Sequence, residues 1–118
     1  MSANFYCWTP DAGLDPKARS FHDRIDALHK APPPEASDRL IAFVEALVAR
    51  YPNLGDTDDD TVWADGPLSG NIIGDFINMS VIWSRCEEAA PFIRETAHQH
   101  GLHFYDPQSE KFYPCPGI

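Results

Sequence analysis

The clearest hydrophobic pattern in the chain is a strict alternation of apolar and polar residues in its last third. Apolar side chains occupy every second position: Ile77, Met79, Val81 and Trp83. A period of two is typical of a strand with one buried face. We therefore expect a strand here, with these four side chains in the core.

A helix and a second strand are predicted directly after this alternation. Ser84 and Glu87 have the spacing of a capping box, which predicts that a helix begins there. Gly101 is suited to end the helix, and residues 102–105 predict another strand. Because Pro91 lies inside the helical span, the helix either kinks there or gives way to a second helix.

The first part of the chain predicts a strand followed by an amphipathic helix. The aromatic run at residues 4–9 is typical of a buried strand. Asp15 and Pro16 then have the character of an N-cap and a first helical residue. The helix should end near Lys30, because the prolines that follow cannot continue it. Its apolar stripe is Phe21, Ile25 and Leu28.

The middle of the chain predicts a second, more apolar helix and short extended pieces. Ser37 is a plausible N-cap, and residues 40–51 carry a wide apolar face that should pack on a sheet. A short strand is expected at 61–64, a bend at Gly74 and a short edge strand at 111–113.

The order strand, helix, helix, strand, strand, helix, strand, short strand predicts a single α+β domain over residues 1–118. We expect a mainly antiparallel, three- to five-stranded sheet with helices packed on one face. A ferredoxin-like split βαβ arrangement, with two helices in its first crossover, is the favoured topology.

Composition and charge narrow the class of function. The chain has 118 residues and is 43% hydrophobic, enough for a core, but it contains no apolar run of the roughly 20 residues that a membrane span requires. No secretory signal is visible, so we expect a cytoplasmic protein with no membrane partner. With 18 acidic and 9 basic residues, a net charge of −9 and no basic cluster, nucleic acid is not an expected partner.

Cysteine usage argues against a disulfide framework. The three cysteines, an odd number, form no Cys-x-x-Cys pair, so free thiols in a reducing compartment are the simple interpretation. Cys86 near a helix start could have a lowered pKa, but Glu87 and Glu88 follow it and would oppose that effect. An inert thiol is the preferred interpretation.

An acidic loop precedes the short strand. It resembles the opening of a calcium loop, but Thr61 stands where the sharp turn needs glycine and Pro67 stands where glutamate belongs. A solvated acidic loop is the simplest interpretation. The functional alternative is a docking patch for a basic surface, with one tryptophan as aromatic anchor. The candidate partner-binding residues are Asp56, Asp58, Asp59, Asp60, Trp63 and Asp65.

Histidines near the end of the chain offer the one alternative enzymatic site. His98, His100, His103 and Asp106 could serve a small metal-dependent enzyme. However, His98 and His100 are two residues apart on a predicted helix and should point away from each other. No nucleophile elbow, phosphate-binding glycine loop or zinc-protease motif is present. We therefore expect no catalytic residue, metal or cofactor.

Three features together resemble a known class of proteins. They are Trp8-x-Pro10 after the first strand, the strand ending at Trp83, and the segment Ala97-x-x-x-Gly101-Leu102-x-x-Tyr105-Asp106-Pro107-Gln108. The chain is similar in order and length to small bacterial immunity proteins of polymorphic and type VI-type secreted toxin systems. The Gly-Leu-x-x-Tyr-Asp-Pro-Gln segment is its specific part, although His103-Phe104-Tyr105 is more aromatic than expected.

This resemblance implies a non-enzymatic protein that acts in antibacterial competition. Such a protein binds one cognate toxin, or effector, and neutralises it by occluding its active site. The resemblance transfers no binding residue. Besides the metal-dependent enzyme, a dimeric ferredoxin-like sensor or adaptor remains an alternative, and a homodimer is a possible form.

Overall fold

The computed structural model describes residues 2–32, 34–53, 61–64 and 67–116. In chain order its helices and strands are β1 (Ser2–Trp8), α1 (Phe21–Lys30), α2 (Asp38–Arg50), β2 (Ile72–Ile73), β3 (Phe76–Ile82), α3 (Cys86–Gln99), β4 (His103–Asp106) and β5 (Lys111–Tyr113). Short 3-10 helices are η1 (Pro10–Ala12), η2 (Leu68–Asn71) and η3 (Trp83–Arg85).

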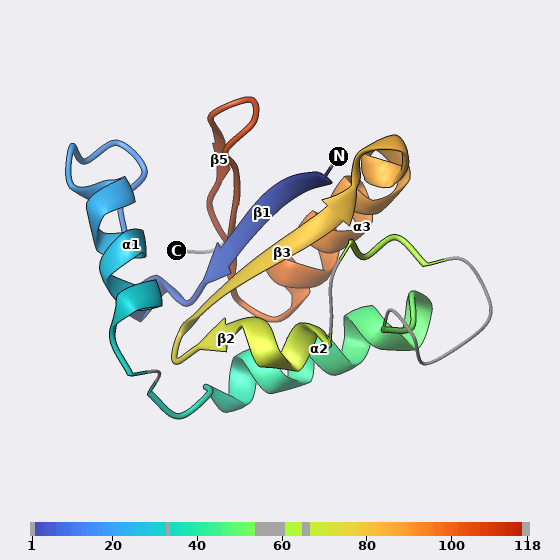
Figure 1. Ribbon diagram of the computed structural model, residues 1–118, viewed down its shortest axis with the longest axis horizontal. Helices are drawn as coiled ribbons and strands as arrows, with labels where there is room; N and C mark the ends of the chain where they lie inside the picture. Colours follow the sequence, from blue (N-terminus) through green and yellow to red (C-terminus); the bar gives the residue numbers. More distant parts are fainter. Residues whose placement is uncertain (1, 33, 54–60, 65–66, 117–118) are drawn as a thin grey trace.

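The strands form one sheet in the order β2-β3-β1-β4-β5, and every neighbouring pair is antiparallel (Figure 1). β3 and β4 consequently run in the same direction on either side of β1, and α3 connects them. The α+β class and the mainly antiparallel sheet are thus confirmed. The ferredoxin-like name stays a prediction, because β2 has only 2 residues and β5 extends the other edge.

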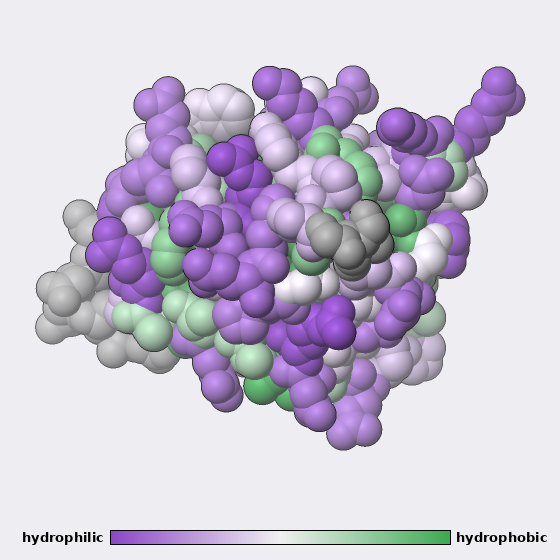
Figure 2. All heavy atoms as spheres, turned by 180° about the vertical axis from the view of Figure 1, so that it is seen from behind, coloured by the Kyte–Doolittle hydropathy of each residue, from purple (hydrophilic) through white to green (hydrophobic). Residues whose placement is uncertain are grey.

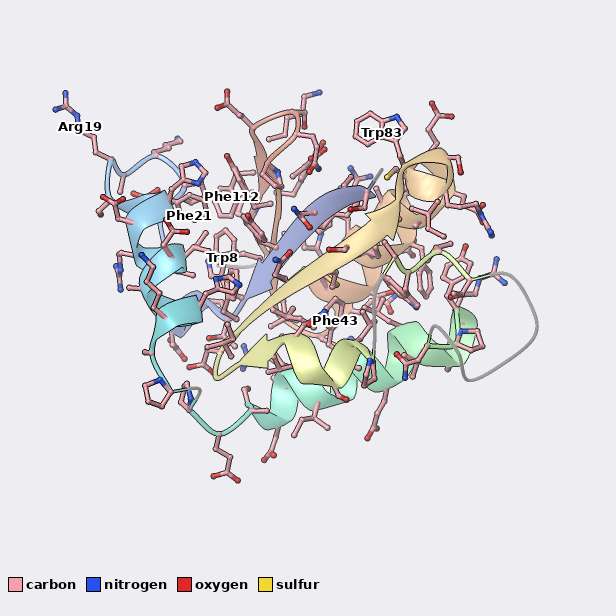
Figure 3. The ribbon with its side chains drawn as sticks, viewed as in Figure 1. Trp8, Arg19, Phe21, Phe43, Trp83 and Phe112 are labelled. Atoms are coloured by element: carbon pink, nitrogen blue, oxygen red, sulfur yellow. The ribbon has the colours of Figure 1, made fainter. Side chains whose placement is uncertain are left out.

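The helices are divided between the two faces of the sheet, which corrects the expectation of a single covered face. Phe5 and Cys7 of β1 belong to the core that α2 and α3 build. Trp8 points to the opposite face, because successive side chains of a strand alternate, and packs with Phe21 of α1. In Figure 3, Phe21 lies beside Trp8, whereas Phe43 of α2 lies apart from them.

α1 begins later than predicted. Asp15 accepts a hydrogen bond from the Lys17 amide through its side chain, and its carbonyl accepts the Ala18 amide. These bonds close an isolated turn, and the helix starts only at Phe21. The rest of the prediction is confirmed, because Phe21 and Ile25 are buried and the helix ends at Lys30. Ser37 caps α2 as expected, accepting a bond from the Arg39 amide.

The start of α3 differs from the sequence prediction, whereas its end agrees with it. Ser84 lies inside η3, and α3 begins at Cys86 without a side-chain cap, so the predicted capping box is wrong. The helix continues through Pro91, so the alternative of two helices is wrong as well. Its end is confirmed: Gly101 has φ of 72° and donates to the His98 carbonyl, the left-handed cap that glycine favours.

The edge of β3 beyond β2 is partly covered. Trp63 forms an isolated bridge with Val81, and the Ala64 amide donates to the Ser80 carbonyl. The short strand expected at 61–64 is therefore present as a single bridge. No helix in the described part of the chain is both long and apolar enough to cross a membrane.

Candidate functional site

The acidic segment predicted as a docking patch connects two described stretches that are held together. The Thr61 hydroxyl donates to the Pro52 carbonyl at 2.6 Å, and the Trp63 indole N–H donates to the Tyr51 carbonyl at 2.7 Å. The Leu68 amide also donates to the Asn53 side chain at 3.1 Å. These bonds fix where the segment leaves and rejoins the domain. Its predicted contact residues lie outside the described residues: Asp56, Asp58, Asp59, Asp60 and Asp65.

Trp63 is a core residue, which corrects its predicted role as an exposed anchor. Its side chain has 0% exposure and belongs to the cluster shared by the sheet, α2 and α3. The ring meets Tyr51 edge-on, with centroids 6.5 Å apart. Its backbone pairs with Val81 at the edge of β3. Trp63 is therefore part of the core and offers no exposed ring to a partner.

Tyr51 joins the end of α2 to the start of α3. Its hydroxyl donates to a Glu88 carboxylate oxygen at 3.3 Å, and the Arg50 guanidinium lies 5.3 Å from its ring centroid. Arg85 forms a hydrogen-bonded ion pair with Glu88. This hydrogen bond is the largest cause that lowers the pKa of Glu88 below its ordinary value. Glu88 is thus a fixed negative charge beside the root of the acidic segment.

Trp83 is the exposed aromatic residue of this part of the molecule. Its side chain is 54% exposed, and Figure 3 shows it directed away from the body of the domain. β3 ends at Ile82 and η3 turns the chain, so the alternation that predicted Trp83 in the core no longer applies. Within the described chain, the other exposed large hydrophobic side chain is Ile41 on α2, at 41%.

We call Trp83, Arg85, Glu88 and Tyr51 together the Trp83 surface. Trp83 and Arg85 belong to η3, Glu88 to the first turn of α3, and Tyr51 directly follows α2. The end of α2 and the start of α3 lie on the right of Figure 1. Viewed from behind, the molecule shows mostly hydrophilic side chains with small, separated hydrophobic areas (Figure 2). The exposed Trp83 is a feature of the surface that hydrophobic patterning cannot locate.

The histidines proposed for the alternative metal site are each bonded to the backbone. His98 Nε2 lies 3.1 Å from the Tyr113 carbonyl, and His100 Nδ1 lies 2.9 Å from the Thr96 carbonyl. His103 Nδ1 accepts the Cys115 amide at 2.8 Å. Among the described residues, no group of three His, Cys, Asp or Glu side chains is placed to hold a metal ion. These three histidines and Asp106 are thus not assembled into one site.

The pKa of two of the thiols is raised rather than lowered. Burial raises the pKa of the Cys7 thiol well above its ordinary value. Burial, followed by the charge of Asp106, raises the pKa of Cys86. The pKa of Cys86 is thus shifted in the direction opposite to the one that a helix N-terminus alone would cause. All three cysteines are free, and Cys7 and Cys115 are buried.

No protein-family model, curated protein or solved structure matches this chain. The Trp83 surface offers recognition chemistry, namely an exposed aromatic ring and ordered charges.

Proposed function

We propose that this protein is a cytoplasmic immunity protein that binds a cognate secreted bacterial toxin and neutralises it by occluding the toxin's active site. The observation that carries the proposal is the exposed Trp83, which precedes by a few residues in the chain the ion pair between Arg85 and Glu88. Tryptophan and arginine are the residue types most enriched among binding hot spots. An exposed ring of this size gains much of its binding energy when a partner buries it.

The charge of the chain supports a basic partner. Its net charge is −9, and four of its aspartates lie within residues 56–60. Thr61 and Trp63, which follow this segment in the chain, are hydrogen-bonded to the residues directly after α2. Tyr51, one of those residues, also contacts Glu88. A net negative charge attracts a positively charged partner and raises the association rate.

The proposed contact patch therefore differs in one residue from the sequence prediction. Trp83 takes the place of Trp63 as the aromatic anchor, because Trp63 is buried and Trp83 is exposed. Asp56, Asp58, Asp59, Asp60 and Asp65 remain proposed contact residues. The aromatic ring would supply affinity, and the carboxylates would supply rate and selectivity for a basic surface.

Co-expression tests the proposal. Each gene that flanks the gene of this protein is expressed in a sensitive bacterial host, with and without this protein, and growth is followed. We expect one product to arrest growth, growth to be restored when this protein is present, and the two proteins to purify as a complex. Unrelieved toxicity of every flanking product, or relief without a complex, would overturn the proposal.

A further inference from the structure

A cavity of about 540 Å³ lies between α1 and the β2–β3 hairpin, away from the Trp83 surface. Its volume is within the range of small-molecule sites in proteins. The larger apolar side chains that line it are Leu14, Leu28, Ile73 and Phe76. They come from a loop, a helix and the hairpin, so the cavity depends on the fold rather than on one segment.

The cavity is hollow because small residues line the positions where larger side chains would fill it. Ala27 and Ala31 lie on the side of α1 toward the hairpin, and Gly74 forms the hairpin turn. Gly74 has φ of 60°, and a Cβ built there would lie 2.7 Å from Pro34 Cγ. A larger residue is therefore excluded at this turn.

The charged lining groups have a negative balance. Glu35 and Asp75 line the cavity with exposed side chains, and neither carboxylate forms a hydrogen bond or ion pair with another described residue. Arg24 also lines it, with one guanidinium N–H donated to the Gly13 carbonyl. Two carboxylates against one guanidinium leave a charge of −1, in a chain whose net charge is −9.

A buried hydroxyl beside the cavity lacks a partner. Thr9 is 5% exposed, and its Oγ1 makes no hydrogen bond to any described residue. Its amide donates to the Asp75 carbonyl and its carbonyl accepts the Ala12 amide, so two residues of the cavity wall hold it in place. A buried hydroxyl without a partner is costly. Thr9 itself does not line the cavity, so the charged side chains open to a bound molecule are those of Glu35, Asp75 and Arg24.

We propose that this cavity binds a small molecule with an apolar, aromatic-sized body and one positively charged amine. The apolar body packs on Leu28, Ile73 and Phe76. The ammonium group is attracted to the carboxylates of Glu35 and Asp75 and donates a hydrogen bond to one of them. An anion of the same size is disfavoured by the negative balance of the lining charges. This site is independent of toxin neutralisation.

Three probes of similar size and different charge test the proposal by NMR titration of the labelled protein: tryptamine, tryptophol and indole-3-propionate. We expect tryptamine to cause saturable shifts of the Ala27, Leu28, Ile73 and Gly74 amides. Its dissociation constant should be smaller than that of indole-3-propionate by at least about fivefold, since one charge is attracted and the other repelled. Absent saturable shifts with tryptamine, or equal binding of the anion, would overturn the proposal.

Substitutions in the wall of the cavity test whether tryptamine binds there. Ala27→Phe fills the cavity and should weaken tryptamine binding by at least about tenfold, while Ala42→Phe on the exposed side of α2 should leave it unchanged. Ala31→Phe serves as a second filling variant if Ala27→Phe loses its folded spectrum. Asp75→Asn should reduce the preference for tryptamine over tryptophol. Wild-type binding by a folded filling variant would contradict the site.

Discussion

The side-chain amide of Gln108 pairs with the backbone of Asn4 as a neighbouring strand would. The Asn4 amide donates to Gln108 Oε1 at 2.8 Å, and Gln108 Nε2 donates to the Asn4 carbonyl at 2.8 Å. β4 pairs with β1 only at residues 6–8, so this amide continues the pairing beyond the end of β4. Asp106 Oδ1 orients it by accepting bonds from the Gln108 amide and side chain. The Tyr-Asp-Pro-Gln motif thus has a structural role in this chain.

Gln108→Ala should destabilise the domain by about 1–2 kcal/mol, because it removes two hydrogen bonds to the backbone of β1. Urea unfolding followed by circular dichroism measures the loss. Gln99→Ala is the matched control, since Gln99 is exposed at the end of α3 and should change stability by less than about 0.5 kcal/mol. Equal effects of the two substitutions would show that the Gln108 pairing contributes nothing specific.

Two buried tryptophans differ in the bonding of their indole N–H. Trp63 donates to the Tyr51 carbonyl at 2.7 Å, whereas Trp8 Nε1 has no partner among the described residues. Trp63→Phe and Trp8→Phe both remove ring volume, but only the first deprives a carbonyl of its donor. We expect Trp63→Phe to cost about 1–3 kcal/mol more than Trp8→Phe, measured as the free energy of unfolding. A larger loss in Trp8→Phe would refute this account.

Gly74→Ala should reduce stability by about 1–3 kcal/mol, because alanine is strained at a φ of 60° and its Cβ would meet Pro34. Gly70→Ala is the comparison, since a Cβ at Gly70 would meet nothing within 4 Å. Thermal unfolding should therefore show a clearly lower midpoint for Gly74→Ala and little change for Gly70→Ala. Similar midpoints for both variants would argue against this geometry of the hairpin turn.

His103 should make stability depend on pH. Its burial, followed by the nearby His98, lowers its pKa below the ordinary value of about 6.5. The unfolded chain therefore takes up this proton at a higher pH than the folded protein. The contribution to stability is fully present above the unfolded pKa and is lost as the pH falls through the folded pKa. Protonation of Nδ1 would also remove the acceptor for the Cys115 amide.

His103→Asn tests this dependence, because an asparagine oxygen can accept the same bond and does not titrate. The free energy of unfolding between pH 7.5 and pH 5 should fall more in the wild type than in this variant. The histidine resonances, followed by NMR, should give a pKa for His103 below that of a histidine in an unfolded peptide. A steeper decline in the variant would contradict the assignment.

The alternation of β3 predicted the strand and three of its core side chains but not its end. Ile77, Met79 and Val81 are buried. Trp83 follows at the next alternate position of the sequence, but its side chain is exposed. Alternation identifies a face only while the backbone stays extended, and η3 turns the chain directly after Ile82. The sequence pattern therefore favours Trp63, next to the acidic residues, as the exposed anchor, whereas the structure exposes Trp83.

The second face of the sheet could have been anticipated from neighbouring apolar pairs. Cys7 and Trp8, Phe76 and Ile77, and Phe104 and Tyr105 each place apolar side chains on both faces of a strand. Trp8 lies opposite Phe76 across β1 and β3, so these pairs collect at one end of the sheet. α1 covers that end. The start of α1 was missed because a local turn at Asp15 has the same sequence signal as a helix N-terminus.

The central claim, that Trp83 anchors a toxin, is tested most directly by the affinity of the complex measured with two matched variants. Trp83→Ser and Ile41→Ser each remove one of the two exposed large hydrophobic side chains of the described chain, so both should remain folded. We predict that Trp83→Ser weakens binding to the growth-arresting flanking gene product by at least about thirtyfold, a hot-spot loss of about 2 kcal/mol, and that Ile41→Ser does not. Wild-type affinity in folded Trp83→Ser, or an equal loss in both variants, would contradict the claim.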